Sequence, residues 1–154
     1  MSDRLSLADA LELWRGTPYI SGDQRPGLGA DCIRLVDGVW ESVFGPRPTR
    51  LPAHANDTAF HRQDIVQEVL TLMIRRWNLG RIRDGTYRPG DGLIISKNGV
   101  EHHSGVVGMD TRVLLHAIPP KAGYTSLEAF SCDGWKIERV YRPLSLAQAA
   151  QLAG

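Results

Sequence analysis

Cys32 is the residue whose type and position most favour nucleophilic chemistry in this sequence. It follows a glycine-rich stretch that ends at Gly29, and it stands at the second position of a helix predicted to open at Asp31. The unpaired backbone N–H groups of a first helical turn, with the positive end of the helix dipole, favour a thiolate over a thiol. A small buried apolar residue is the alternative interpretation of Cys32. Its place at a helix start after glycines favours the nucleophile.

A thiolate nucleophile needs a base within hydrogen-bond reach, and the base needs a group that orients it. Three histidines, His102, His103 and His116, fall in two predicted strands that meet at Met109-Asp110. With a two-residue loop there, His103 lies directly opposite His116 on one face of the strand pair. Neighbouring side chains alternate, so His102 points to the other face. A three-residue loop would favour His102 instead; we predict that His103 is the base.

The sequence offers little for metal chemistry. It contains neither a Cys-x-x-Cys nor a His-Glu-x-x-His spacing, and two cysteines cannot form a disulfide framework. A metal site built from the histidines and Cys32 is a weaker alternative, because a Cys–His pair explains the same positions without a cofactor. We therefore expect no cofactor. His54 and His61 are predicted to be solvated, and Cys132 to be structural or incidental.

The charged residues nearly cancel. The chain has 18 Lys+Arg against 17 Asp+Glu, a net charge of +1, which disfavours a nucleic-acid binder held mainly by charge. Arg75, Arg76, Arg81 and Arg83 are interpreted as a solvated helix end rather than a basic patch. The apolar runs fall short of a membrane span, and the first residues are polar, unlike a signal peptide. We expect synthesis in the cytoplasm, no nucleic-acid partner and no membrane insertion.

Helices are expected first along the chain and strands afterwards. Apolar residues at helical spacing predict helices over 6–14, 31–44 and 64–78. Glycine and proline predict loops over 16–29, 45–60 and 119–134. Alternating patterns predict strands over 93–95, 103–108, 112–118 and 136–141, with Asn98-Gly99 as a hairpin turn. This order predicts one α+β domain over 1–154, with an insertion at 45–63 and a short helix at 145–154.

Five short motifs occur in an order that resembles the NlpC/p60 family, papain-like cysteine peptidases that cut bacterial cell-wall peptides. In chain order they are Trp14-Arg15-Gly16-Thr17-Pro18-Tyr19, Gly29-Ala30-Asp31-Cys32, Arg88-Pro89-Gly90-Asp91, His103-Ser104-Gly105 and Leu115-His116-Ala117. The resemblance covers about residues 10–142, nearly the whole chain. It implies a papain-like fold in which N-terminal helices pack on a central antiparallel β-sheet.

The resemblance implies a role for each matched residue. Cys32 would be the nucleophile, His103 the general base, and His116 the residue that orients the His103 imidazole. Tyr19 matches a tyrosine whose hydroxyl helps to hold the developing oxyanion beside the Cys32 backbone N–H; a half-buried aromatic is an equal alternative. Asp31 would shape the substrate end of the cleft, with a plain helix N-cap as the alternative.

Substrate contacts are expected from Asp31, Arg34 and Ser104. The family usually carries small residues, often Ser-Gly, after the cysteine, whereas this chain has Ile33-Arg34. Ile33 would narrow the site, and Arg34 would add a positive charge near the cleft. The departure concerns the choice of substrate and leaves the reacting atoms in place.

Three stretches resemble tail-associated peptidases of siphophages and gene transfer agents: residues 31–40, the insertion after Phe44, and residues 134–143. The resemblance implies a peptidase of the peptidoglycan stem peptide that cuts between D-glutamate and a diamino acid. Its expected partners are tail hub or baseplate proteins, and its expected place of action is the periplasm or cell wall. Two alternatives stay open: a structural tail-tip or baseplate component with weak or lost catalysis, and an amidase or acyltransferase that uses the same triad.

Overall fold

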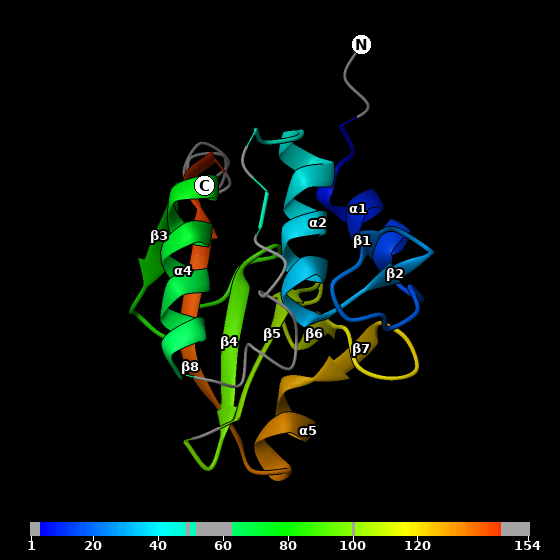
Figure 1. Cartoon of the computed structure of the whole chain (residues 1–154). Helices are drawn as coiled ribbons and strands as arrows, with labels where there is room; N and C mark the ends of the chain where they lie inside the picture. The colour runs from blue at the N-terminus through cyan, green and yellow to red at the C-terminus, as the bar shows by residue number, and fades with distance from the viewer. Residues whose placement is uncertain (1–3, 49, 52–62, 100, 146–154) are drawn as a thin grey trace.

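The computed structural model describes residues 4–48, 50–51, 63–99 and 101–145 (Figure 1). Its helices are α1 (Leu7–Trp14), α2 (Cys32–Phe44), α4 (Gln63–Trp77) and α5 (Leu127–Cys132). Its strands are β1 (Gln24–Arg25), β2 (Gly29–Ala30), β3 (Leu79–Ile82), β4 (Gly92–Lys97), β5 (Glu101–Val107), β6 (Val113–His116), β7 (Gly123–Ser126) and β8 (Trp135–Pro143). Over these ranges, no helix combines the length and apolar character that crossing a membrane requires.

Six strands form one antiparallel sheet in the order β3-β8-β4-β5-β6-β7, and β1 pairs with β2 in a separate hairpin. The last strand, β8, lies between β3 and β4, so strands far apart in the sequence meet in the sheet. Helices that precede an antiparallel sheet confirm the expected α+β class.

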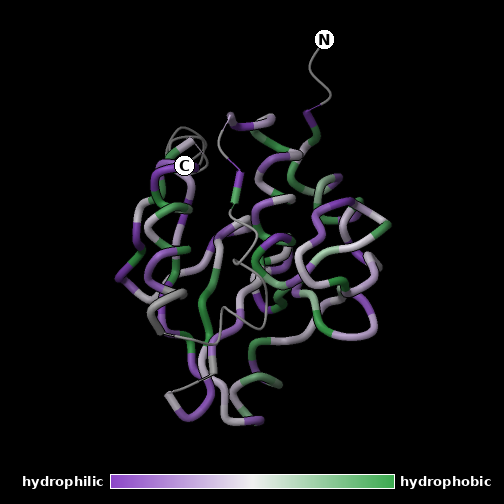
Figure 2. Tube along the Cα trace, viewed as in Figure 1, coloured by the Kyte–Doolittle hydropathy of each residue, from purple (hydrophilic) through white to green (hydrophobic). Residues whose placement is uncertain are grey.

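The two faces of the sheet carry separate hydrophobic clusters, because side chains alternate along each strand. Ile94, Val106 and Leu115 belong to the cluster that includes α1, α2 and α4. Leu93 and Val107 belong to the cluster that includes α5. Figure 2 shows the hydrophobic colour running along β4, in the middle of the sheet. Three helices therefore cover one face and α5 covers the other.

Helix α2 is fixed in place by caps at both ends and by close packing along its length. Asp31 is its N-cap and Gly45, with φ 92°, is its C-cap, as the sequence predicts. A Cβ added at Gly38 would overlap the ring of Trp14, so glycine lets α1 approach α2 closely. The Trp40 indole N–H donates to the Gly90 carbonyl at 2.9 Å, which ties α2 to the entrance of β4.

A buried carboxylate joins α2 to α4. Asp37, 1% exposed, accepts hydrogen bonds from Arg76 Nε at 2.8 Å and from Trp77 Nε1 at 2.6 Å. The Arg76 side chain is only 4% exposed. The prediction of a solvated helix end is therefore wrong for Arg76, because a carboxylate on another helix neutralises its charge in the interior.

Short elements replace parts of the predicted loops. The small β1–β2 hairpin lies at the end of 16–29 and extends to Ala30, and β7 and α5 lie within 119–134. Strand β3 was not expected either: Asn78, with φ 50°, follows the end of α4, and Gly80 pairs with Arg142 of β8. Pairing with neighbouring strands stabilises segments whose own sequences carry weak strand signals.

Other predictions have simpler outcomes. Asn98 and Gly99 both have positive φ, 58° and 68°, which confirms the predicted hairpin turn between β4 and β5. Cys132 is exposed at the end of α5. His54, His61, most of the insertion and the predicted tail helix lie outside the described residues.

Candidate active site

Cys32 is the first residue of α2, and no part of it is exposed. Its position at the helix start confirms the local geometry expected from the sequence, where the N–H groups of the first turn favour negative charge. Helix α2 contacts both β5 and β6, the strands that carry His103 and His116. Figure 1 shows the start of α2 beside these two strands.

His103 and His116 form a hydrogen-bonded pair, with Nε2 of His103 3.0 Å from Nδ1 of His116. The two rings stand nearly perpendicular, at 86°. Both residues are buried, His103 at 7% exposed and His116 at 3%. This is the contact that an imidazole base and its orienting residue require.

The register between β5 and β6 differs from the prediction. Val106 pairs with Leu115, and the hairpin loop has four residues rather than two. Continuing this register places Gly105 opposite His116, with His103 two positions further on the same face. The histidines therefore meet as diagonal neighbours, not directly opposite. A register change of two residues keeps each side chain on its face, which is why the pair survives.

The protonation of His116 follows from its surroundings. Burial lowers the pKa of His116 from 6.5 to about 4, so its ring is neutral at neutral pH and carries one N–H. His116 Nε2 lies 2.8 Å from Thr125 Oγ1. If His103 is to accept a proton at Nδ1, its Nε2–H donates to His116 Nδ1. His116 then holds its hydrogen on Nε2 and donates to the Thr125 hydroxyl.

Thr125 is the site residue that the sequence motifs missed. It lies on β7, where it pairs with Leu114, in a stretch that the sequence predicted to be a loop. Only the pairing of β6 with β7 places Thr125 on the same face as His116. No pattern in the sequence identifies Thr125 as a site residue, because its position depends on the pairing of β6 with β7.

Two aromatic side chains enclose the histidine pair. The Phe130 ring of α5 lies 4.9 Å from the His116 ring, and the Trp135 ring of β8 lies 6.1 Å from the His103 ring, measured between centroids. These rings exclude water from the pair, which is the burial that lowers the pKa of His116.

Tyr19 lies beside the strand that leads into Cys32. Its backbone N–H donates to the Pro120 carbonyl at 3.0 Å, and it forms a parallel bridge with Ala30. The Tyr19 backbone thus lies beside Ala30, two positions before Cys32. Tyr19 itself is half-buried. Stabilisation of an oxyanion by its hydroxyl stays a prediction.

Asp31 is committed to capping α2. Its Oδ1 accepts the Arg34 backbone N–H at 3.0 Å, and its Oδ2 accepts Arg34 Nη1 at 3.0 Å and the Gly22 backbone N–H at 2.7 Å. Burial raises the pKa of Asp31, and these hydrogen bonds oppose the shift. Asp31 and Arg34 are 0% and 5% exposed, so the structure matches the N-cap alternative, and substrate contact by either residue stays a prediction.

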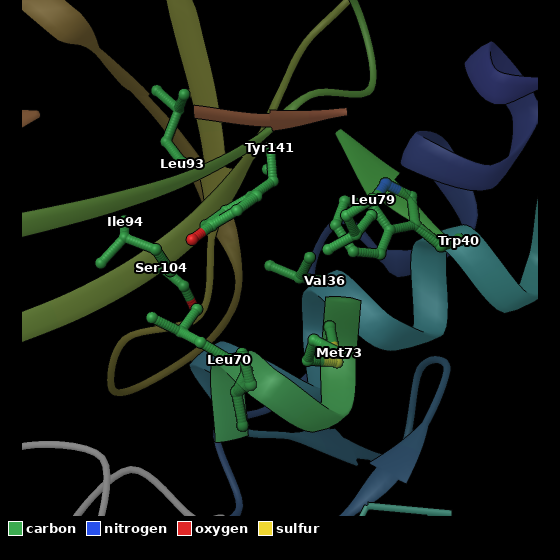
Figure 3. A pocket seen from close by; sticks show the side chains of 11 residues that line it. Val36, Trp40, Leu70, Met73, Leu79, Leu93, Ile94, Ser104 and Tyr141 are labelled. Carbon is green, nitrogen blue, oxygen red and sulfur yellow. The ribbon is translucent and has the colours of Figure 1, made fainter. Parts of the chain in front are cut away.

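Ile33 and Ser104 line an internal cavity of about 20 Å³ between α2, α4 and the sheet (Figure 3). Ile33 is 2% exposed and belongs to the same core cluster as Cys32, and the expectation that it narrows the site stays a prediction. Ser104 Oγ has no hydrogen-bond partner among the described residues. Because neighbouring strand residues alternate, Ser104 faces the side of the sheet opposite His103. The structure therefore does not bring Ser104 together with the histidine pair.

His102 also lies on the face opposite His103. It lines a separate hollow with Gln67 and Leu70 of α4, as the predicted alternation requires. Within the described ranges, no group of three or more His, Cys, Asp or Glu side chains is placed to hold a metal ion.

No family profile and no curated protein matches this sequence. Solved structures do match. The NlpC/p60 domain of the peptidoglycan hydrolase SagA has a TM-score of 0.56 and 16% identity, over 88% of this chain and 95% of that chain. A lipoprotein-like protein of the NLP/p60 family from Staphylococcus aureus subsp. aureus Mu50 has a TM-score of 0.54 and 19% identity, over 89% of this chain and 40% of that chain. The chain therefore has the α+β fold of NlpC/p60 domains.

Proposed function

We propose that this protein is a cysteine peptidase of the NlpC/p60 family that hydrolyses peptide stems of peptidoglycan. The observation that carries the proposal is the 3.0 Å contact between His103 and His116, on strands that α2 contacts with Cys32 at its start. The shared fold with the NlpC/p60 domain of a peptidoglycan hydrolase supports the choice of substrate.

The first half of the reaction is acylation of Cys32. His103 Nδ1 takes the proton of the Cys32 thiol, and the sulfur attacks the carbonyl carbon of the scissile amide. The resulting oxyanion accepts hydrogen bonds from the Cys32 backbone N–H and the Tyr19 hydroxyl. The C–N bond then breaks, and the His103 imidazolium gives its proton to the leaving amine, which leaves a thioester.

The second half is hydrolysis of the thioester. His103, neutral again, takes a proton from water while the water oxygen attacks the thioester carbonyl. Collapse of this intermediate breaks the C–S bond and returns the proton to the Cys32 sulfur. His116 stays neutral throughout, because its pKa of about 4 keeps it an acceptor for His103 Nε2–H.

The proposed scissile bond joins D-glutamate to a diamino acid, and the proposed carrier is a phage-like or gene transfer agent tail. The resemblance of residues 31–40 and 134–143 to tail-associated peptidases supports this setting. In it, the protein is made in the cytoplasm, binds tail hub or baseplate proteins, and acts at the cell wall. An amidase or acyltransferase with the same triad differs only in the bond cut or in the acyl acceptor.

The test is mass spectrometry of stem peptides and muropeptides after incubation with the wild-type protein, Cys32→Ala and Cys132→Ala. We expect cleavage by the wild type and by Cys132→Ala, and none by Cys32→Ala, because Cys132 is an exposed cysteine on α5. The masses of the products identify the peptide bond that is cleaved. Cleavage by Cys32→Ala would contradict the thiol mechanism, provided that circular dichroism shows all three proteins folded.

A structural tail component is the second candidate, and the complete burial of Cys32 favours it, since a substrate cannot reach an enclosed sulfur. In that case, neither wild type nor Cys32→Ala cuts any peptide, while both co-sediment equally with tail particles. Cleavage that starts only after docking to the tail would instead support a peptidase whose site opens on the particle.

A further inference from the structure

A further hollow, lined by neither His103 nor His116, lies alongside α2. Its volume is about 500 Å³, and it is bounded by α2, α4, β1 with the turn before it, and the segment after α2. Five arginines line it: Arg25, Arg34, Arg47, Arg50 and Arg76. Among the described residues of the lining there are three carboxylates, those of Asp23, Asp37 and Glu41, so this part of the lining carries an excess of positive charge.

Two of these arginines, Arg47 and Arg50, have no carboxylate partner among the described residues. Arg25, Arg34 and Arg76 each pair with a carboxylate. In the part of the chain that the structure describes, Arg47 and Arg50 line the pocket without appearing in any of the ion pairs. The Arg47 guanidinium lies 4.8 Å from the centre of the Trp77 ring, which restrains its position at the pocket.

The Arg76 guanidinium has one hydrogen-bond donor that is unsatisfied among the described residues. Its Nε and Nη2 donate to Asp37, and Nη2 also donates to Glu41. Its Nη1 is buried and has no acceptor among the described residues. Asp37 cannot supply one, because its two oxygens already accept four hydrogen bonds, including those from Gln24 and Trp77. A buried, unmatched donor on a charged group is costly, and an added acceptor removes that cost.

We propose that this pocket is an oxyanion-binding site, distinct from the Cys32 site. Guanidinium groups bind carboxylate and phosphate oxygens through paired N–H donors, and the pocket presents Arg47 and Arg50 for that purpose beside Arg76. The oxyanion comes from one of two sources: a free anion such as phosphate, or a carboxylate of a wall peptide. Because Arg34 lines the pocket and also binds Asp31, the N-cap before Cys32, the site borders the start of α2.

The test is a titration of ¹⁵N-labelled protein with inorganic phosphate, in which sodium chloride holds the ionic strength constant and the arginine Nε–H signals are followed. A second titration uses a stem peptide with free carboxylates and the Cys32→Ala variant, so that binding is measured without cleavage. We expect saturable shifts of the Arg47 and Arg50 signals in at least one titration. Shifts with phosphate would show that the pocket binds a free anion. Shifts with the stem peptide but not with phosphate would show that it binds a carboxylate of the wall peptide.

Matched variants separate this site from general attraction. Arg47→Gln and Arg50→Gln are each expected to weaken binding at least about fivefold, whereas Arg112→Gln, an exposed arginine on the β5–β6 loop, leaves binding unchanged. Both pocket arginines are exposed, and among the described residues neither makes an ion pair, so we expect these variants to keep the fold. The proposal is overturned if neither ligand shifts the two signals, or if Arg112→Gln weakens binding as much as the pocket variants. Neither result depends on whether the protein cuts peptides.

Discussion

Thr125 Oγ1 and His116 Nε2 lie 2.8 Å apart, and this contact extends the histidine pair onto a third strand. His103 on β5, His116 on β6 and Thr125 on β7 thus form one line of hydrogen bonds across three neighbouring strands. A neutral His116 has a single N–H, so the position of that hydrogen decides which nitrogen of His103 carries its own. In the tautomer in which His116 Nε2–H donates to Thr125, His116 Nδ1 accepts from His103 Nε2–H, and His103 Nδ1 is the nitrogen that takes a proton.

Thr125→Val removes the hydroxyl and keeps the shape of the side chain. The loss of one hydrogen bond, about 1 kcal/mol, is expected to lower kcat about fivefold to tenfold while KM changes little. Steady-state kinetics on a stem peptide measure both parameters. Thr125→Ser keeps the hydroxyl and is expected to retain most of the activity. A Val variant as active as the Ser variant would remove Thr125 from the proposed line of positioning residues.

The depressed pKa of His116 predicts a pH-dependent stability. Because the pKa is about 4 in the folded protein and 6.5 in the unfolded chain, the unfolded chain binds more protons between these values. The free energy of unfolding therefore falls as the pH falls from about 6.5 to 4, by about 3 kcal/mol for this residue. Urea unfolding at several pH values, for wild type and His116→Gln, isolates the contribution. Parallel curves for the two proteins would show that His116 is not buried as a neutral ring.

Gly38→Ala tests the close contact between α1 and α2. Alanine favours a helix over glycine by about 1 kcal/mol, but the new Cβ would overlap the Trp14 ring, and overpacking costs about 1–3 kcal/mol. We expect a net loss of about 0–2 kcal/mol and lower activity, since α2 carries Cys32. Gly123→Ala is the control, because a Cβ there meets no atom within 4 Å. Equal stability of the two variants in urea would contradict the packing argument.

Asp37→Asn tests the buried charge pair between α2 and α4. Removing the carboxylate leaves the buried Arg76 guanidinium with only Glu41, whose side chain is 39% exposed, as its counter-charge, which is expected to cost at most about 3–5 kcal/mol. The matched control is Asp110→Asn, which breaks the exposed pair with Arg112 and should cost less than about 1 kcal/mol. Thermal and urea unfolding compare the two. A small loss for Asp37→Asn would mean that solvent reaches Arg76.

The sequence by itself determined the features that depend on near neighbours along the chain. Helices α1, α2 and α4 follow the spacing of their apolar residues, and the caps Ser6 and Asp31 are the first residues of the predicted helices 6–14 and 31–44. The turn at Asn98-Gly99 and the opposite orientation of His102 and His103 are local as well, since a turn type and the alternation of a strand need no distant partner.

The tertiary structure decided everything that depends on residues far apart. Strand β3 is stabilised by pairing with β8, which lies some sixty residues later in the sequence. Strand β7 is stabilised by pairing with β6. The pairing of His103 with His116 was predicted, but their diagonal contact, the role of Thr125 and the burial of Arg76 were not. Each of these depends on which strand or helix lies alongside, and on the length of a loop. Pairing between distant segments is chosen by the packing of the whole core, which no local pattern in the sequence specifies.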